Sequence, residues 1–147
     1  MSEKAVQKET VGSFILKILN GTTVAIVVAL IPNAILATFL KPFASNPLVA
    51  NWLHIVTVFQ FFTPIMAGFL IGMQFKMNPI QSATLAGTTY IASGAWKFTM
   101  ATVAGKGVGL FQLAGIGDVI NTMLIAALAV LVIQAVSPKL GSLNLVL

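Results

Sequence analysis

Asp118 is the residue of this 147-residue sequence best suited to chemistry, because it is the only carboxylate beyond the N-terminal tail. It lies between a glycine-rich stretch and a long aliphatic one, where a charge is costly unless water or a polar partner solvates it. Asn121, one turn into the helix that we expect next, is placed to bind the same polar solute. The alternative is that Asp118 only caps this helix, since Asp is a preferred N-cap residue.

Gln74, Gln81 and Ser82 flank a tight turn, Lys76 to Pro79, and bring amide and hydroxyl groups to the mouths of two adjacent segments. Amides both donate and accept hydrogen bonds, so they suit uncharged, hydroxyl-rich ligands. The same side chains also join helices in membrane proteins without any ligand, and that interpretation stays open for each of them.

Lys97 and His54 complete the set of candidate solute-binding residues. Lys97 follows Trp96 at the expected end of a span, where a lysine snorkels to the lipid headgroups or pairs with Asp118. His54 lies two residues after Trp52, which favours the headgroup level, with a proton relay as the alternative. The absence of cysteine and the single histidine exclude disulfides, thiolate nucleophiles and Cys/His zinc sites. We expect no catalytic residue, metal or cofactor.

The elements that position these residues are predicted to lie in a membrane. Hydrophobic residues make up 58% of the chain and charged residues 7%, with a mean hydropathy of +0.99, whereas a soluble domain carries about 25% charged residues. Too few polar residues remain to cover a core, so the outer surface meets lipid. All eight basic residues are lysines scattered singly, and without a basic face nucleic-acid binding is excluded.

Four intervals without charge are long enough for the roughly 20 residues that a spanning helix needs. We therefore predict an all-α integral membrane fold of about four transmembrane helices. Pro32 should kink the first, and Pro64 with Gly68 should bend the second. The third is rich in small residues and should pack against protein. The four predicted spans are Ile18 to Leu40, Trp52 to Phe75, the interval between Lys76 and Lys97, and Ile120 to Val136.

Three further segments surround these spans. Residues 1–17 read as an amphipathic interfacial helix that leads into a transmembrane domain, residues 18–147, and acidic residues near Met1 favour a retained anchor over a cleaved signal peptide. Gly105 to Gly117 is expected to be a glycine-rich loop or a re-entrant hairpin. The apolar run Leu143 to Leu147 reads as the start of another segment, so we expect one half of a longer permease.

The lysines also predict the orientation of the chain. With the N-terminus inside, most of them fall in the cytoplasm, whereas Lys41 and Lys106 fall outside and Lys97 lies at or within the third span. This balance favours a multi-pass protein of a bacterial cytoplasmic membrane with both ends inside. The lysines placed in the cytoplasm are Lys4, Lys8, Lys17, Lys76 and Lys139.

Three stretches together resemble the N-terminal half of enzyme IIC-like proteins of the bacterial phosphotransferase system, the branch that includes toxin-regulator membrane proteins. They are Leu16 to Pro32 (LKILNGTTVAIVVALIP), Gly72 to Ser82 (GMQFKMNPIQS) and Gly117 to Asn121 (GDVIN). The resemblance implies a homodimeric sugar-permease fold with re-entrant segments and a partner phosphotransfer subunit. The positions that match the family's polar motifs are Gln74, Pro79, Gln81, Ser82, Asp118 and Asn121.

Two departures from the family limit what the resemblance implies. The chain has about half the expected length, and it lacks a counterpart to the His and Gly-Ile-Thr-Glu elements of sugar-phosphorylating members. We therefore do not expect this chain to phosphorylate sugar. The leading hypothesis is a permease for a small polar solute, a sugar or similar hydroxyl-rich compound. The alternative is a non-transporting membrane regulator or assembly subunit, and an intramembrane enzyme is the weakest hypothesis because no nucleophile or metal set accompanies Asp118 and His54.

Overall fold

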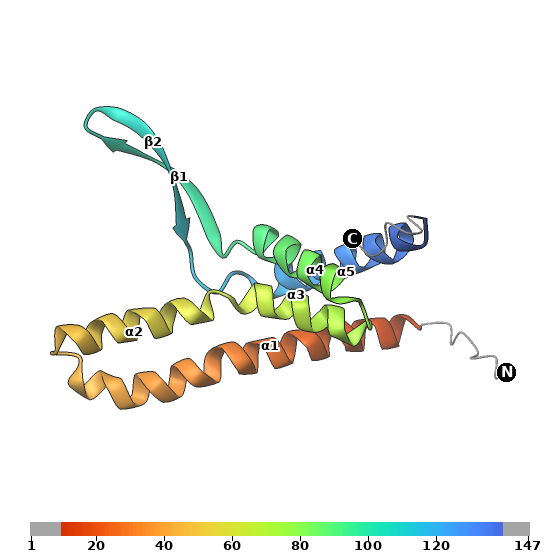
Figure 1. Cartoon of the computed structure of the whole chain (residues 1–147), viewed down its shortest axis with the longest axis horizontal. Helices are drawn as coiled ribbons and strands as arrows, with labels where there is room; N and C mark the ends of the chain where they lie inside the picture. The colour runs from red at the N-terminus through yellow and green to blue at the C-terminus, as the bar shows by residue number, and fades with distance from the viewer. Residues whose placement is uncertain (1–9, 140–147) are drawn as a thin grey trace.

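The protein is helical with one β-hairpin, as seen in a computed structural model that describes residues 10–139 (Figure 1). The all-α prediction is therefore wrong for one segment, where two antiparallel strands form a small sheet. In chain order the elements are α1 (Val11–Leu40), η1 (Lys41–Phe43), α2 (Pro47–Gln60), α3 (Thr63–Gln74), α4 (Pro79–Ala92), β1 (Trp96–Val103), β2 (Lys106–Leu113), α5 (Val119–Val136) and η2 (Ser137–Lys139).

Side-chain caps explain where several helices begin. Asn46, Asn78 and Asp118 each have an extended backbone, and their side chains accept hydrogen bonds from backbone N–H groups of the first turn of α2, α4 and α5. These N–H groups have no partner within their own helix, so each cap stabilises a helix start. Pro47 and Pro79 follow two of the caps, at positions where the missing N–H of proline costs nothing.

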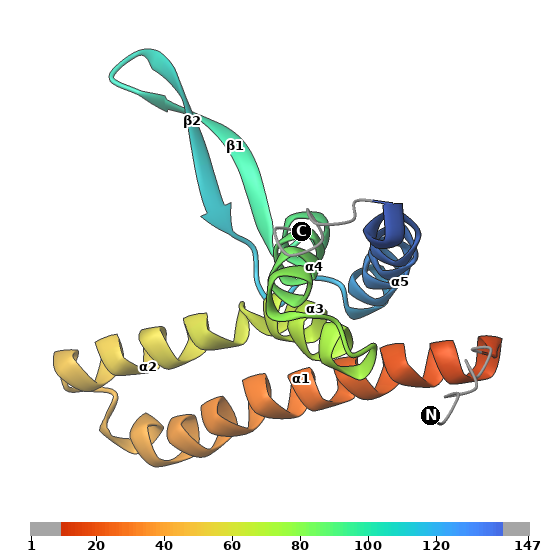
Figure 2. The same cartoon turned by 45° about the vertical axis from the view of Figure 1, so that its right-hand side comes forward.

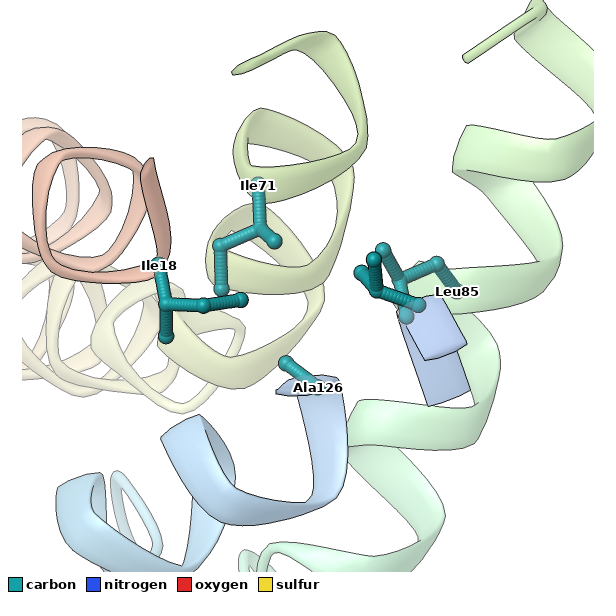
Figure 3. Close-up of a cluster of buried hydrophobic side chains, with 5 residues drawn as sticks. Ile18, Ile71, Leu85 and Ala126 are labelled. Atoms are coloured by element: carbon teal, nitrogen blue, oxygen red, sulfur yellow. The ribbon is translucent and has the colours of Figure 1, made fainter. Parts of the chain in front are cut away.

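A small apolar core lies where α1, α3, α4 and α5 meet. Ile71 and Leu85 are fully buried, Ile18 is nearly so, and Ala126 from α5 approaches the same cluster (Figure 3). Val130 of α5 completes the cluster. This core uses only the N-terminal part of α1, so the rest of that helix extends beyond it (Figure 1).

Glycines let the helices of this core approach one another closely. A Cβ at Gly21 would lie 2.7 Å from the Ile71 Cα, which brings α1 onto α3. Gly68 and Gly72 of α3 likewise bring α3 close to α4, where Ser82 lies against Gly72. Such small-residue contacts are common between membrane helices. The prediction that the small-sided third segment packs against protein is confirmed for one face of α4.

Two helices are long and apolar enough to cross a membrane, α1 with η1 and α5 with η2. A third span results if α2 and α3, which are bent by 40°, act as one. The predicted bend in the second segment is a break at Phe61 and Phe62, and Pro64 lies in the first turn of α3. α4 has 14 residues, fewer than the roughly 20 that a span needs, so a count of four spans is not confirmed.

The segment after α4 differs most from its prediction. The sequence predicts a glycine-rich loop or a re-entrant hairpin. The structure has a hairpin of two strands, β1 and β2, which pair directly across a two-residue turn, Ala104–Gly105, in which both residues have positive φ. The hairpin projects away from the helices, with only its base near them (Figures 1 and 2). The C-terminal part of α1 and the whole of α2 form a second projection, which we call the α1–α2 arm, residues 32–60 (Figure 1).

Both chain ends carry predictions that the structure leaves untested. α1 begins at Val11 and continues through Lys17 and Pro32 to Leu40. Residues 1–9 of the predicted amphipathic segment and the apolar run Leu143 to Leu147 lie outside the described residues.

Candidate functional site

Four of the predicted polar residues fall into two groups at opposite ends of α4. Gln81 and Ser82 lie in its first turn. At its other end, Asn121 donates to the carbonyl of the last residue, Ala92, and the Asp118 N–H donates to the carbonyl of the next residue, Ser93. With a rise of about 1.5 Å per residue, Ala92 lies about 16 Å along the helix from Gln81. The structure therefore joins the predicted residues into two separate polar groups.

Gln81 connects three elements at the first of these ends. Its backbone N–H donates to the Asn78 Oδ1 at 2.8 Å, and its own Oε1 accepts from the Asn78 N–H at 3.1 Å, which completes a capping box. Its Nε2 donates to the Ser137 Oγ at 2.8 Å, at the end of α5. The amide therefore joins helices, which is the ligand-free interpretation of this residue.

Ser82, the second residue of this group, is buried with an unpaired hydroxyl. Its side chain is only 1% exposed, and its Oγ has no hydrogen-bond partner. The hydroxyl lies against Gly72, where a Cβ would be 2.7 Å away. A buried hydroxyl without a partner costs about 1 to 3 kcal/mol. Gln74, by contrast, is exposed at the end of α3.

Asp118 caps α5, as one of its two interpretations required. The carboxylate Oδ1 accepts from the Asn121 N–H at 2.9 Å, and the Asp118 carbonyl accepts from the Thr122 hydroxyl at 2.7 Å. The Asn121 Nδ2 donates to the Ala92 carbonyl and so ties α5 to the end of α4. The Asp118 side chain nevertheless remains exposed, and it is the only carboxylate side chain among residues 10–139.

Ser93 organises this second end, and the sequence reasoning did not identify it. Its Oγ donates to the Tyr90 carbonyl at 2.8 Å and accepts from the Ala95 N–H at 3.1 Å. Its carbonyl accepts from the Asp118 N–H at 2.9 Å, beside Gly117. Ser93 thus holds the end of α4, the base of the hairpin and the start of α5 together. The Ser-Gly pair at this position is a turn signal that could have identified it.

Lys97 and His54 lie apart from both groups. Lys97 is exposed in β1 opposite Gln112, so its predicted place at the end of a helical span is wrong. No ion pair joins it to Asp118 within residues 10–139. His54 is exposed on α2 and lines an apolar groove of about 570 Å³ between α1 and α2. Asn33 lines the same groove, and its Oδ1 is buried without a hydrogen-bond partner.

The chemistry available at both ends is hydrogen bonding by amides, hydroxyls and one carboxylate. Within the described part of the chain, no group of three His, Cys, Asp or Glu side chains is placed to hold a metal ion. Residues 16–147 match the family described as "Phosphotransferase system, EIIC". No curated protein and no solved structure matches the chain. Because the family match covers most of the sequence and confirms the resemblance of its motifs, this chain belongs to the EIIC family of the phosphotransferase system.

Proposed function

We propose that this chain forms part of a permease that moves a small polar solute, a sugar or similar hydroxyl-rich compound, across a bacterial cytoplasmic membrane. The observation that carries the proposal is the EIIC family match over residues 16–147. The two long apolar helices agree with it, because they give the chain the means to cross a bilayer.

The distribution of lysines supports an orientation with the N-terminus inside. The Lys17 ammonium lies 5.0 Å from the centre of the Phe75 ring, next to Lys76 in the α3–α4 turn. Lys139 follows Ser137, which contacts the first turn of α4 at this same end. Three lysines from separate elements therefore gather at one end, as expected for the cytoplasmic side.

The proposed solute contact is the Asp118 carboxylate, and Asn121 positions it: its backbone N–H donates to the Asp118 Oδ1, and its Nδ2 ties α5 to the Ala92 carbonyl. The Asp118 carboxylate is exposed, and carboxylates are strong acceptors for sugar hydroxyls. Gln81, at the other end of α4, already uses its amide to join Asn78 and Ser137. We therefore assign Gln81 and Ser82 to helix packing and the Asp118 end to the solute.

The Asp118→Asn variant tests this proposal, because Asn keeps the capping oxygen but removes the charge. We expect uptake of the transported sugar, found with a panel of radiolabelled monosaccharides and disaccharides in cells expressing the chain, to fall by about tenfold or more, the equivalent of about 1.4 kcal/mol. Gln134→Ala on the exposed side of α5 is the matched control and should transport normally. Full uptake by the Asp118→Asn variant would exclude the carboxylate as a solute contact.

We further propose that the permease is a homodimer and that a separate phosphotransfer subunit supplies phosphorylation. The family match supports a separate phosphotransfer subunit, because the family is part of a phosphotransferase system. α2 has no buried residue, so its apolar side chains are available to lipid or to a second protein. The same observation favours the second candidate, a non-transporting regulator or assembly subunit. Normal sugar uptake after deletion, together with a partner cross-linked to α2, would select that candidate.

A further inference from the structure

The β-hairpin presents two distinct faces that follow from its register. Trp96 pairs with Leu113 and Phe98 with Phe111, so these side chains share one face. The Phe111 ring lies 5.5 Å from Trp96 and 5.1 Å from Phe98, centre to centre. On the other face, Thr99 pairs with Leu110. The middle of that face is also apolar, because Ala101 pairs with Val108, and the charged residues Lys97 and Lys106 lie towards its two ends.

The two edges of the hairpin are not equivalent. β1 is anchored to the helices at its first residue, because the Trp96 Nε1 donates to the Ile91 carbonyl at 2.9 Å. Thr99 and Ala101 of β1 are half-buried. Every residue of β2 is exposed. Proteins normally protect such an edge with charges, proline or a bulge. β2 has one lysine, Lys106 at its first position, and no proline, so most of its edge is unprotected.

An unprotected edge is unfavourable in lipid and prone to pair with another strand in water, the two solvents that a membrane protein meets. A hairpin of two strands is marginally stable alone and gains independent stability from a third strand. Alternate residues of β2 direct their backbone N–H and C=O groups away from β1. Lipid cannot satisfy these groups, and an apolar edge exposed to water attracts another strand. The edge of β2 therefore needs a partner that supplies backbone hydrogen bonds.

We propose that β2 pairs antiparallel with β2 of a second copy of this chain, so that the two hairpins form a four-stranded sheet across a two-fold axis. Two identical antiparallel edges are self-complementary, and a two-fold axis makes the contact closed. The antiparallel direction also places Lys106 of each copy at opposite ends of the contact, which separates the like charges. The inference builds on the proposed homodimer and names the surface that joins it.

The phase of the hydrogen bonds fixes the register of this contact. The Ala114 N–H donates to the Ala95 carbonyl at 2.8 Å, and alternation from this pair directs the N–H and C=O groups of residues 107, 109, 111 and 113 outward. The outward N–H and C=O groups of one copy must bond to the outward groups of the other. All of these residues have odd numbers, so the residue numbers of any two facing residues add to an even total. Full overlap of residues 107–113 then places Leu110 opposite Leu110, and Val108 opposite Gln112.

Cysteine cross-linking tests this register directly, because the sequence contains no cysteine. Leu110→Cys should form a disulfide-linked dimer when intact membranes are oxidised, since facing residues of an antiparallel pair have Cα atoms within disulfide range. Thr99→Cys is the matched control: it pairs with Leu110 within the hairpin but lies on β1, and it should give little dimer. Differently tagged copies with Val108→Cys and Gln112→Cys should also cross-link, which covers the case that Leu110→Cys disturbs folding.

A charge on the edge supplies the second measurement. Leu110→Lys brings two ammonium groups together at the axis and should lower copurification of differently tagged copies about tenfold, whereas Thr99→Lys should leave it unchanged. Copies that copurify without any cross-link through β2 would overturn the inference and leave the homodimer standing. In a Trp52→Phe background, Trp96 is the single tryptophan whose fluorescence can be measured. Quenching of that fluorescence by brominated lipids, without cross-links through β2, would place the hairpin in lipid and would also overturn the inference. Failure of any copies to associate would overturn both.

Discussion

The seam between α3 and α4 and the α1–α2 arm are both made of apolar helices, yet they differ in how closely they pack. At the seam, Gly68 and Gly72 bring the two backbones into contact, and a Cβ at either position would overlap atoms of α4. In the arm, α2 buries no residue, and a groove of about 570 Å³ separates it from α1. The difference shows that the seam stabilises the single chain, whereas the arm offers surface to other molecules.

The largest expected effect comes from closing the space at the seam. In the Gly68→Val variant the new Cβ would lie 2.7 Å from the Ala86 Cα and 2.8 Å from the Leu85 carbonyl oxygen, and backbone atoms cannot move aside cheaply. We expect a loss of about 3 kcal/mol or more, measured as the free energy of unfolding in detergent. Gly87→Val is the matched control on α4, because no atom lies within 4 Å of its Cβ position. Similar losses for both variants would show that helix propensity, not packing, accounts for the effect.

The next effect concerns the first turn of α4. Gln81→Ala removes the hydrogen bonds to the Asn78 N–H and the Ser137 Oγ, and at about 1 kcal/mol each the free energy of unfolding should fall by about 2 kcal/mol. Gln74→Ala removes the same amide from an exposed position and should change stability by less than about 0.5 kcal/mol. A Gln81→Ala variant that is as stable as the parent but fails to transport sugar would move Gln81 from packing to solute binding.

Asp118→Ala should lower the free energy of unfolding by less than Gly68→Val or Gln81→Ala does. The variant loses the N-cap of α5 and about 1 kcal/mol of stability, whereas Asp118→Asn keeps the capping oxygen and nearly all of that stability. Thermal unfolding of the two variants in detergent measures the difference. If both variants lost the same stability, the charge near the helix N-terminus, and not the hydrogen bond to the Asn121 N–H, would be the stabilising feature.

How well the sequence predicted the structure depends on whether local residues or distant ones decide each feature. Local chemistry predicted the long apolar helices, the cap at Asp118 and an interruption near Pro64. The spacing of charges could not reveal that Ser93 and Gly94 end α4 early, because an interval without charge says nothing of the turns inside it. The two strands of the hairpin were missed because glycines in β2 resemble a loop and because apolar residues on both faces hide the alternation typical of strands.

The candidate site was predicted by residue type but not by arrangement. The sequence identified Asp118, Asn121 and Gln81 as polar residues in apolar surroundings, where each needs a partner. It could not place Gln81 beside Ser137, which is 56 residues away, or Asn121 beside Ala92, because both contacts depend on the antiparallel packing of α4 and α5. The separation of these residues into two groups is therefore a property of the tertiary fold.

The smallest expected effect belongs to the arm and completes the comparison. Ile55 of α2 is 60% exposed and lines the groove, so Ile55→Ala should change the free energy of unfolding of the single chain by less than about 0.5 kcal/mol. Ile71→Ala makes the same substitution in α3, where the side chain is fully buried, and should cost about 2 to 5 kcal/mol. Unfolding of both variants in detergent, with the copies kept apart by dilution, measures the contrast. Equal losses would mean that the arm packs as tightly as the seam, whereas a loss for Ile55→Ala that appears only at high protein concentration would show that another copy covers the arm.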